Sequence, residues 1–413
     1  MNYFIKAIKI NKLLHLQDFT IDIPAENPHL IITGKNGSGK TILLKTIADF
    51  LELIRNEQNL DYLQFEERLT ESKQKLYICR DEQSKLKYKN RVDFWSRKCE
   101  TFFGKAYAEF VDIYKLTESI QQEDFLFAFY PAERKPQMLE PNNPLKPKLP
   151  KERRVKDILT NQFLFFLADL KIQEALARNE QQYDDANDIK VWFEDFEGIL
   201  RSIYNDQTLQ LEFNYKNYSF SIKTEGKDFK FTEMSDGFIA AIDIIADLIL
   251  KMQNNNSLTR NYQKQGIVLI DEIETHLHLE LQRLIMPLLT RLFPNIQFIV
   301  TTHSPFVLSS MPNAVAYDLE HREIIDELTE YSYESLAEGY FGVKTDSSYT
   351  EMRLNELQDL LDKEYLENSD ALKIRQLIDD FEKIPEAVSP LIKGNFNQLR
   401  IIYSDKIKSL EQL

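Results

Sequence analysis

The stretch Gly34-Lys35-Asn36-Gly37-Ser38-Gly39-Lys40-Thr41 matches the pattern G-x4-G-K-[ST] at every defined position. It follows the apolar run His29–Thr33, which is typical of a buried central strand. After it, residues 42–54 carry apolar side chains at helical spacing. The order of strand, glycine-rich loop and helix predicts an α/β fold of the P-loop NTPase class.

The loop has the composition of a phosphate-binding site. Its glycines let backbone N–H groups turn toward phosphate oxygens, and the following helix adds the partial positive charge of its N-terminus. We expect Lys40 to reach the β- and γ-phosphates of ATP and the Thr41 hydroxyl to ligate Mg²⁺. The predicted nucleotide-binding residues of this loop are Gly34, Asn36, Gly37, Ser38, Gly39, Lys40 and Thr41.

A second apolar run ends in two acidic residues. Residues 267–270 predict a buried strand, which would deliver Asp271 to the magnesium side of the site. Glu272 follows directly, where it can orient or deprotonate the attacking water. The alternative is a strand that ends in two ordinary surface acids. The P-loop upstream favours the Walker B interpretation.

The next buried strand, residues 296–300, leads into Thr301-Thr302-His303-Ser304. With the helix predicted over residues 279–292, it completes a parallel crossover. A lone histidine is usually structural, but His303 lies one crossover beyond the acidic pair, where it can hydrogen-bond the γ-phosphate or the water. The predicted catalytic residues are therefore Lys40, Glu272 and His303, and the predicted metal ligands are Thr41 and Asp271.

The segment Met234-Ser235-Asp236-Gly237-Phe238 begins a long apolar helix, about thirty-five residues before the acidic pair. A helix start with a serine and a glycine forms an anion site. Ser235 or Asp236 is expected to cap this helix in any case. The sharper interpretation is an ABC signature motif, in which Ser235 and Gly237 contact the γ-phosphate held by another protomer.

The composition and net charge of the whole chain disfavour several classes of protein. The 413 residues carry a net charge of −15, which disfavours general nucleic-acid binding although local basic patches remain possible. No run of about 18 apolar residues occurs, so we expect no membrane-spanning segment. The start of the chain lacks the layout of a signal peptide, and Cys79 and Cys99 are expected to be reduced thiols. These features predict a cytoplasmic protein.

The pattern along the chain predicts two halves of one ATPase head, with a β-subdomain, separated by helical insertions. Prolines between residues 131 and 150 are too dense for a helix or a central strand. The predicted parts are 1–56, the N-terminal head with Walker A; 57–124, a charged helical insertion; 125–204, a proline-rich loop and helical lobe; 205–345, the C-terminal head; and 346–413, an acidic helical tail.

Taken together, these motifs resemble the ABC-type ATPases of the SMC-like branch. The stretch from Asp271 to His278, followed by residues 301–306, resembles the AAA family ATPases of bacterial anti-phage and restriction-associated systems, and the ATPase head of the overcoming-lysogenisation-defect nucleases. The signature here is Met-Ser-Asp-Gly-Phe, where many ABC proteins have Leu-Ser-Gly-Gly-Gln. Gln121 and Gln122 are weak candidates for a Q-loop. No Asp-x-Asp pair ends an apolar strand after Pro305, so we expect no Toprim nuclease domain.

The resemblance implies that ATP and Mg²⁺ bind at an interface between two copies of the chain and that hydrolysis reopens this dimer. It also implies a sensor or regulator in anti-phage defence that gates a separate effector, a nuclease or a toxin. An alternative is an SMC-like ATPase of DNA repair or chromosome maintenance, but residues 57–125 lack the sustained heptads of a long coiled coil. A transporter subunit is disfavoured by the large helical insertions.

Three further features have weaker interpretations. His276 and His278 could hold zinc, but no other cysteine or histidine cluster completes such a site, and a contact between protomers is favoured. Two basic stretches suit either nucleic acid or a solvated surface, and the solvated surface is favoured for both. The first runs from Lys73 to Lys98 and includes Tyr77, Tyr88, Phe94 and Trp95; the second comprises Arg134, Lys135, Lys146, Lys148, Lys151, Arg153, Arg154 and Lys156.

Overall fold

The computed structural model divides the chain into two units, Met1–Tyr333 and Glu334–Leu413. It describes residues 3–56, 61–134, 137–150, 153–253, 264–325, 336, 348–363, 365–383 and 390–411. Among these residues, no helix is long and apolar enough to cross a membrane.

The first unit is built on a six-stranded sheet of order β12-β11-β3-β10-β9-β5. Its neighbouring strands are parallel except for the edge pair β11 and β12. The strands are β3 (His29–Thr33), β5 (Phe125–Tyr130), β9 (Gln265–Ile270), β10 (Ile296–Thr301), β11 (Ala314–Asp318) and β12 (Glu323–Ile325). Every residue of β3, β5 and β10 is buried, as the apolar runs predict for parallel strands covered on both faces.

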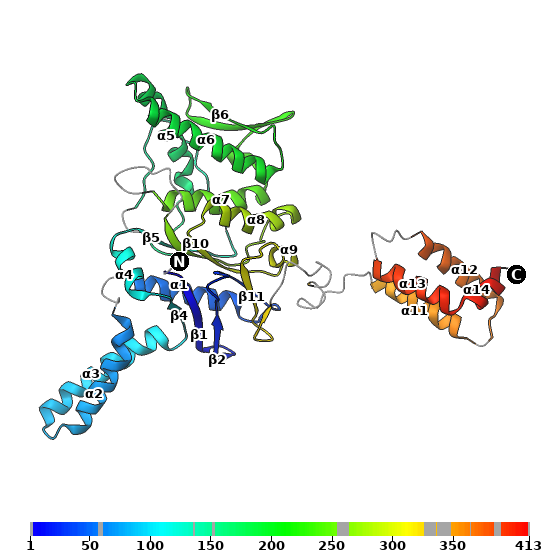
Figure 1. Cartoon of the computed structure of the whole chain (residues 1–413), viewed down its shortest axis with the longest axis horizontal. Coiled ribbons are helices and arrows are strands. Elements are labelled where there is room, and N and C mark those ends of the chain that lie inside the picture. The colour runs from blue at the N-terminus through cyan, green and yellow to red at the C-terminus, as the bar shows by residue number, and fades with distance from the viewer. Residues whose placement is uncertain are drawn as a thin grey trace. The chain divides into compact units, whose positions relative to one another are not determined.

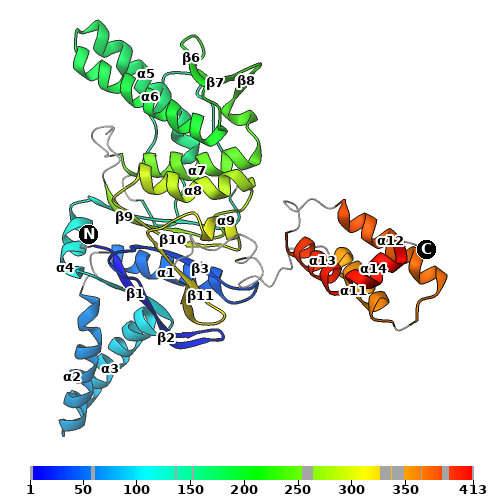
Figure 2. The ribbon, with the colours of Figure 1, turned by 45° about the vertical axis from the view of Figure 1, so that its right-hand side comes forward.

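Helices cover both faces of this sheet. Helix α1 (Lys40–Arg55) lies on one face, and α7 (Asp236–Lys251) and α8 (Leu279–Leu292) lie side by side on the other (Figures 1 and 2). The predicted crossover is confirmed, because α8 connects β9 to its parallel neighbour β10. Since the carboxyl ends of parallel strands meet at one edge, this order brings residues that follow β3, β9 and β10 together.

A smaller antiparallel sheet of order β2-β1-β4 packs with α1 into the same core. It consists of β1 (Ile5–Leu13), β2 (Leu16–Asp22) and β4 (Ala106–Phe110). The first two strands follow the predicted alternation. Strand β4 was not predicted, because it lies within residues 57–124, which the charge pattern predicts to be a helical insertion. Its five residues alternate between buried and half-buried positions, and only the pairing with β1 distinguishes them from a helix end.

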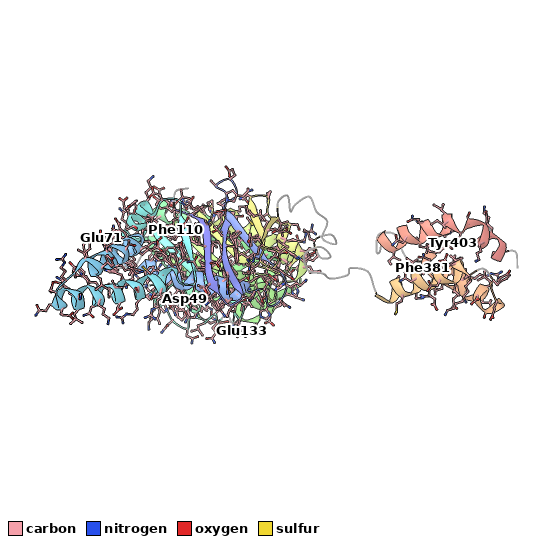
Figure 3. The ribbon with its side chains drawn as sticks, turned by 90° about the horizontal axis from the view of Figure 1, so that it is seen from below. Asp49, Glu71, Phe110, Glu133, Phe381 and Tyr403 are labelled. Atoms are coloured by element: carbon pink, nitrogen blue, oxygen red, sulfur yellow. The ribbon has the colours of Figure 1, made fainter. Side chains whose placement is uncertain are left out.

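Two helical projections leave the first unit. The first is an arm of α2 (Phe65–Ile78) and α3 (Glu82–Phe103), which follows the 3₁₀ helix η2 (Tyr62–Gln64) and carries Glu71 in Figure 3. Helix α4 (Ile113–Gln121) returns the chain from β4 to β5.

The second projection pairs α5 (Phe163–Asn179) with α6 (Tyr183–Tyr204) beside an antiparallel sheet (Figure 2). Residues 137–150 have no regular structure, as their prolines predict. Strands β6 (Gln210–Asn214) and β7 (Ser219–Thr224) form the predicted hairpin, and β8 (Lys227–Lys230) extends it. The short helices η3 (Thr160–Gln162), η4 (Phe231–Glu233) and α9 (Pro305–Leu308) complete the unit.

The second unit has a core of its own. Its helices are α11 (Ser348–Asp362), α12 (Asn368–Glu382), α13 (Pro390–Ile402) and α14 (Ser404–Glu411). Buried residues from these helices, including Ile374, Phe381 and Phe396, form one cluster, and Tyr403 donates its hydroxyl to Asp362 (Figure 3). The segment predicted to be an acidic tail is therefore a packed helical unit.

Candidate active site

The P-loop joins β3 to α1 in a conformation that depends on its glycines. Gly34, Gly37 and Gly39 have φ angles of 130°, 84° and 101°, a region that favours glycine. Lys40 is buried, and its Nζ donates to the carbonyl oxygen of Gly34 at 2.7 Å and to that of the next residue at 3.0 Å. Burial lowers the pKa of Lys40, while the charges of Glu272 and its acidic neighbours oppose this shift. The predicted phosphate lysine therefore lies beside the predicted catalytic acid.

Hydrogen bonds join the P-loop to the end of β9. The Thr41 hydroxyl donates to Oδ1 of Asp271 at 3.2 Å, and the Thr301 hydroxyl donates to the same oxygen at 2.7 Å. Asp271 and Thr301 are both fully buried. Three segments far apart in the sequence thus meet at one carboxylate.

The same carboxylate fits a magnesium ion. Its second oxygen, Oδ2 of Asp271, is buried and has no hydrogen-bond partner among the described residues. A buried carboxylate oxygen without a donor is costly unless it meets a cation, and Mg²⁺ prefers carboxylate and hydroxyl oxygens together with phosphate oxygens. The residues that would hold the ion are Asp271 and Thr41.

Glu272 lies on a strained turn directly after Asp271. Its φ angle is 45°, a left-handed conformation that costs a residue other than glycine about 1 kcal/mol. The turn is held by the Glu272 N–H, which donates to Oγ1 of Thr301 at 2.7 Å. The Thr275 hydroxyl also lies 3.4 Å from Oε2 of Glu272. The strained backbone of Glu272 fits a fold that holds the Glu272 side chain in one orientation.

His303 is fixed to the same turn through Glu274. Its backbone N–H donates to Oε1 of Glu274 at 2.5 Å, and the Thr302 hydroxyl donates to Oε2 at 2.8 Å. Burial raises the pKa of Glu274, although these hydrogen bonds oppose the shift. Burial lowers the pKa of His303, and the positive charge of Lys40 lowers it further. The imidazole is therefore neutral at pH 7 and can accept or donate one hydrogen bond.

The predicted signature residues lie at the N-terminus of α7. Ser235 is the exposed N-cap residue, but its hydroxyl makes no capping hydrogen bond, contrary to the helix-cap expectation. A Cβ atom on Gly237 would lie 2.9 Å from the carbonyl oxygen of His276 and 3.0 Å from the His278 ring. Glycine is therefore needed where α7 meets the loop after Asp271. Among the described residues, no hydrogen bond or ion pair joins Ser235 to the P-loop of its own chain.

Three weaker predictions have structural outcomes. Gln121 and Gln122 precede β5, at the edge of the sheet opposite Asp271, because Phe125 pairs with Gln265. The candidates for a Q-loop are therefore wrong. Within the described part of the chain, no group of three histidine, cysteine or acidic residues could hold a metal. Both cysteines are free.

The first basic stretch is the α2–α3 arm. Trp95 packs against Phe65 with ring centroids 5.4 Å apart, and the guanidinium of Arg68 lies 5.1 Å from the Trp95 ring. These rings therefore serve packing within the arm. Tyr77 at the end of α2 is 92% exposed and Phe94 in the middle of α3 is 47% exposed, so a nucleic-acid contact on this arm stays a prediction.

The second basic stretch is divided between surface and interior. Lys146, Lys148, Arg154 and Lys156 are exposed, as a solvated surface predicts, and Lys156 pairs with Asp49 at 2.5 Å. Arg134 is only 7% exposed, and burial lowers the pKa of the half-buried Arg153. Lys135 and Lys151 lie outside the described residues. The two arginines donate to backbone carbonyl groups.

Sequence reasoning missed three residues that position the site: Thr301, Glu274 and Arg134. The sequence does contain a signal for two of them. Thr301 is a hydroxyl residue at the end of β10, and Glu274 is a second acidic residue after the Asp271-Glu272 pair. Arg134 has no local signal, because it follows a strand that is distant in sequence from β9. The structure brings together Lys40, Thr41, Asp271, Glu272 and His303 as predicted, whereas Asn36 is exposed in the P-loop.

Comparison with known proteins adds a family match. A family model described as "AAA domain, putative AbiEii toxin, Type IV TA system" matches residues 30–309, a span that contains the P-loop, the signature segment, the acidic pair and His303. Among solved structures, the SmcHead bound to the C-winged helix domain of ScpA shares 11% identity over 79% of this chain and 100% of that chain, with a TM-score of 0.38.

Curated relatives match over parts of their length. The "Septu protein PtuA" of Bacillus mycoides (strain KBAB4) is 28% identical over 330 residues, which are 78% of this chain and 40% of that protein. The "Retron Vc95 probable ATPase" of Vibrio cholerae is 37% identical over 113 residues, 27% of this chain and 21% of that protein. The "Retron Ec83 probable ATPase" of Escherichia coli is 48% identical over 77 residues, 18% of this chain and 14% of that protein. The chain thus spans less than half the length of each of these relatives.

Proposed function

The chain belongs to the AAA-domain family described above, and on that premise we propose that it is an ATPase that hydrolyses ATP with Mg²⁺ at sites shared between two copies. The observation that carries this proposal is the cluster in which Thr41 and Thr301 both donate to one oxygen of Asp271 while the other oxygen is buried without a partner. That arrangement suits a magnesium–nucleotide complex.

In this mechanism Lys40 exchanges its contacts with P-loop carbonyls for contacts with the β- and γ-phosphates of ATP. Mg²⁺ would neutralise charge on the phosphates. Glu272 orients a water and accepts its proton as the water oxygen bonds to the γ-phosphorus and ADP leaves. The neutral His303 ring hydrogen-bonds the γ-phosphate or the water. These roles use the geometry of the turn, in which Glu272 and His303 are fixed through Thr301 and Glu274.

A shared site accounts for the exposed Ser235. Its hydroxyl lies at a helix N-terminus without a capping bond, so it can donate to an anion on a second chain. The nucleotide would then lie between Lys40 of one copy and Ser235 of the other. Binding would close the dimer, and hydrolysis would reopen it.

The names of the curated relatives, Septu protein PtuA and two retron ATPases, support a role in defence against phage. We propose that the chain is a sensor or regulator in such a defence system. It would control the activity of a separate effector protein, a nuclease or a toxin. The two free cysteines agree with a reducing compartment, and we assign the protein to the cytoplasm.

Steady-state ATP hydrolysis with and without Mg²⁺ tests the chemistry. Glu272→Gln should retain nucleotide binding, lose turnover and accumulate a larger ATP-bound complex in size-exclusion chromatography. Hydrolysis at the wild-type rate by this variant would show that Glu272 is not the general base.

A mixing experiment tests the shared site. Lys40→Ala and Ser235→Arg chains are each expected to be inactive, but their mixture forms heterodimers with one intact site and should recover part of the turnover. The matched control mixes Lys40→Ala with a chain that carries both substitutions, which leaves no intact site. Equal activity in the two mixtures at every ratio would exclude a site built from two chains.

The effector proposal has a separate test. The chain would be co-expressed with the product of the neighbouring gene and purified through a tag on one of them. Co-elution that depends on ATP in the Glu272→Gln variant supports gating, and a neighbouring gene that encodes a permease would contradict the proposed role.

A further inference from the structure

Arg134 is a buried arginine that the proposed chemistry does not use. It follows β5 and was predicted only as a member of a basic stretch, yet it is 7% exposed. Burial lowers its pKa, and the charges that most oppose this shift belong to Asp243 and to Glu274, with Asp271 and Glu272 behind them. A guanidinium so enclosed needs a specific role, because taking its charge out of water is costly unless the group is bonded.

The guanidinium donates to the backbone of the turn that carries the catalytic acid. Nη1 donates to the carbonyl oxygens of Pro131 at 3.2 Å and Asp271 at 3.1 Å. Nη2 donates to the carbonyl oxygen of Glu272 at 3.2 Å. The carbonyl oxygens of Ile273 and Thr275 lie at 3.4 and 3.5 Å and add weaker contacts. The Arg134 side chain therefore contacts the carbonyl oxygens of nearly every residue in the Asp271–Thr275 turn.

The Asp271–Thr275 turn is held in its conformation by residues outside the turn. Glu272 has a left-handed backbone, and the N–H group of Glu272 is already held by Thr301 on β10. Arg134 takes the carbonyl side of the same residues from the end of β5. The strained turn is thus held between the two strands that flank β9 in the sheet. Release of either side would let Glu272 relax to an ordinary backbone conformation and turn its carboxylate.

Asp243 on α7, the helix that starts at the signature segment, is a counter-charge of the guanidinium. Nε of Arg134 is buried without a hydrogen-bond partner among the described residues, and so is Oδ1 of Asp243. The two groups therefore attract each other without a hydrogen bond, and the hydrogen bonds that hold Arg134 are those to the turn and to Pro131.

We propose that Arg134 is a positioning residue for ATP hydrolysis, in which its guanidinium fixes the Asp271–Thr275 turn so that Glu272 faces the nucleotide. This inference rests on the proposed function.

Arg134→Lys is the direct test. A lysine keeps the charge but has a single ammonium on a flexible chain, so it cannot hold several carbonyl groups in one plane. We expect kcat to fall about 10- to 100-fold, as for other residues that orient a catalytic group, with the KM for ATP changed less than about threefold. The matched control is Arg153→Lys, because Arg153 is a half-buried arginine that, like Arg134, donates to a backbone carbonyl, that of Lys251. This control should keep kcat within about twofold of the wild type.

A double variant separates positioning from general loss of structure. If Arg134 acts through Glu272, the residual rate of Glu272→Gln should not fall further when Arg134→Lys is added, and nucleotide binding should be equal in the two. A wild-type kcat in Arg134→Lys, or a loss of ATP binding in parallel with kcat, overturns the inference. Absence of ATP hydrolysis in the wild-type protein overturns the proposed function itself and the inference with it.

If Arg134→Lys does not fold, Arg134→Gln decides the question. Its neutral side-chain amide removes the buried charge and can donate to fewer carbonyl groups, so kcat should fall while the KM for ATP is retained. A wild-type kcat in a folded Arg134→Gln protein rejects the inference.

Discussion

Thr301 offers a sharp test of how the site is held together. Its hydroxyl donates to Asp271 and accepts from the Glu272 N–H, both at 2.7 Å, and the side chain is fully buried. Thr301→Val has nearly the same shape but removes both bonds. Thr301→Ser keeps the hydroxyl and loses one methyl group, which makes it the matched control.

The expected cost follows from the two groups left without a partner. An unsatisfied buried N–H costs about 1–3 kcal/mol, and a lost hydrogen bond to a carboxylate costs about 1.5–3 kcal/mol. Because both losses occur at one side chain, they are not additive, and we expect Thr301→Val to reduce the free energy of unfolding by about 2–4 kcal/mol. Loss of one buried methyl group in Thr301→Ser should cost about 1 kcal/mol.

Urea-induced unfolding followed by tryptophan fluorescence measures this difference. Both tryptophans of the chain, Trp95 and Trp192, lie in the first unit, so the signal reports on the unit that contains Thr301. A single transition with equal m-values in both variants permits the comparison. A difference below about 0.5 kcal/mol between the valine and serine variants would refute the argument that this hydroxyl holds the turn. Turnover should fall with Thr301→Val much more than with Thr301→Ser.

Three further predictions follow from buried groups. His29 is buried with its pKa lowered to about 4, and its Nδ1 accepts from a backbone N–H of β10, so the folded state holds the neutral ring. The unfolded chain binds a proton at about pH 6.5, so this stabilisation is complete above that pH and is lost as pH falls toward 4; the gap in melting temperature between wild type and His29→Asn, which cannot titrate, should shrink or reverse over this range. Gly237→Ala should lower turnover and melting temperature, because the new Cβ would meet the carbonyl oxygen of His276 at 2.9 Å; unchanged values would contradict the close contact. Tyr130→Phe removes a 2.6 Å hydrogen bond to the buried Asp247, and thermal unfolding should show a loss of about 1–3 kcal/mol.

The sequence by itself predicted the residues of the candidate site and most of the central sheet. The P-loop, the acidic pair after residues 267–270 and His303 were predictable because each follows a short apolar run, and buried parallel strands carry functional residues at their carboxyl ends. The crossover from β9 through α8 to β10 was predictable for the same reason, since the helical period of residues 279–292 separates two such runs.

Tertiary structure alone decided which residues support that chemistry. Arg134 looked like one member of a charged loop, and β4 looked like the end of a helical insertion, because both depend on partners far away in the sequence. A hydrogen bond between Arg134 and Asp271 spans 137 positions. Local patterns report on neighbours along the chain, whereas the burial of a charge and the pairing of a five-residue strand are set by elements that meet only after folding. The proposed catalytic groups were therefore predictable from the sequence, and the residues that hold them in place were not.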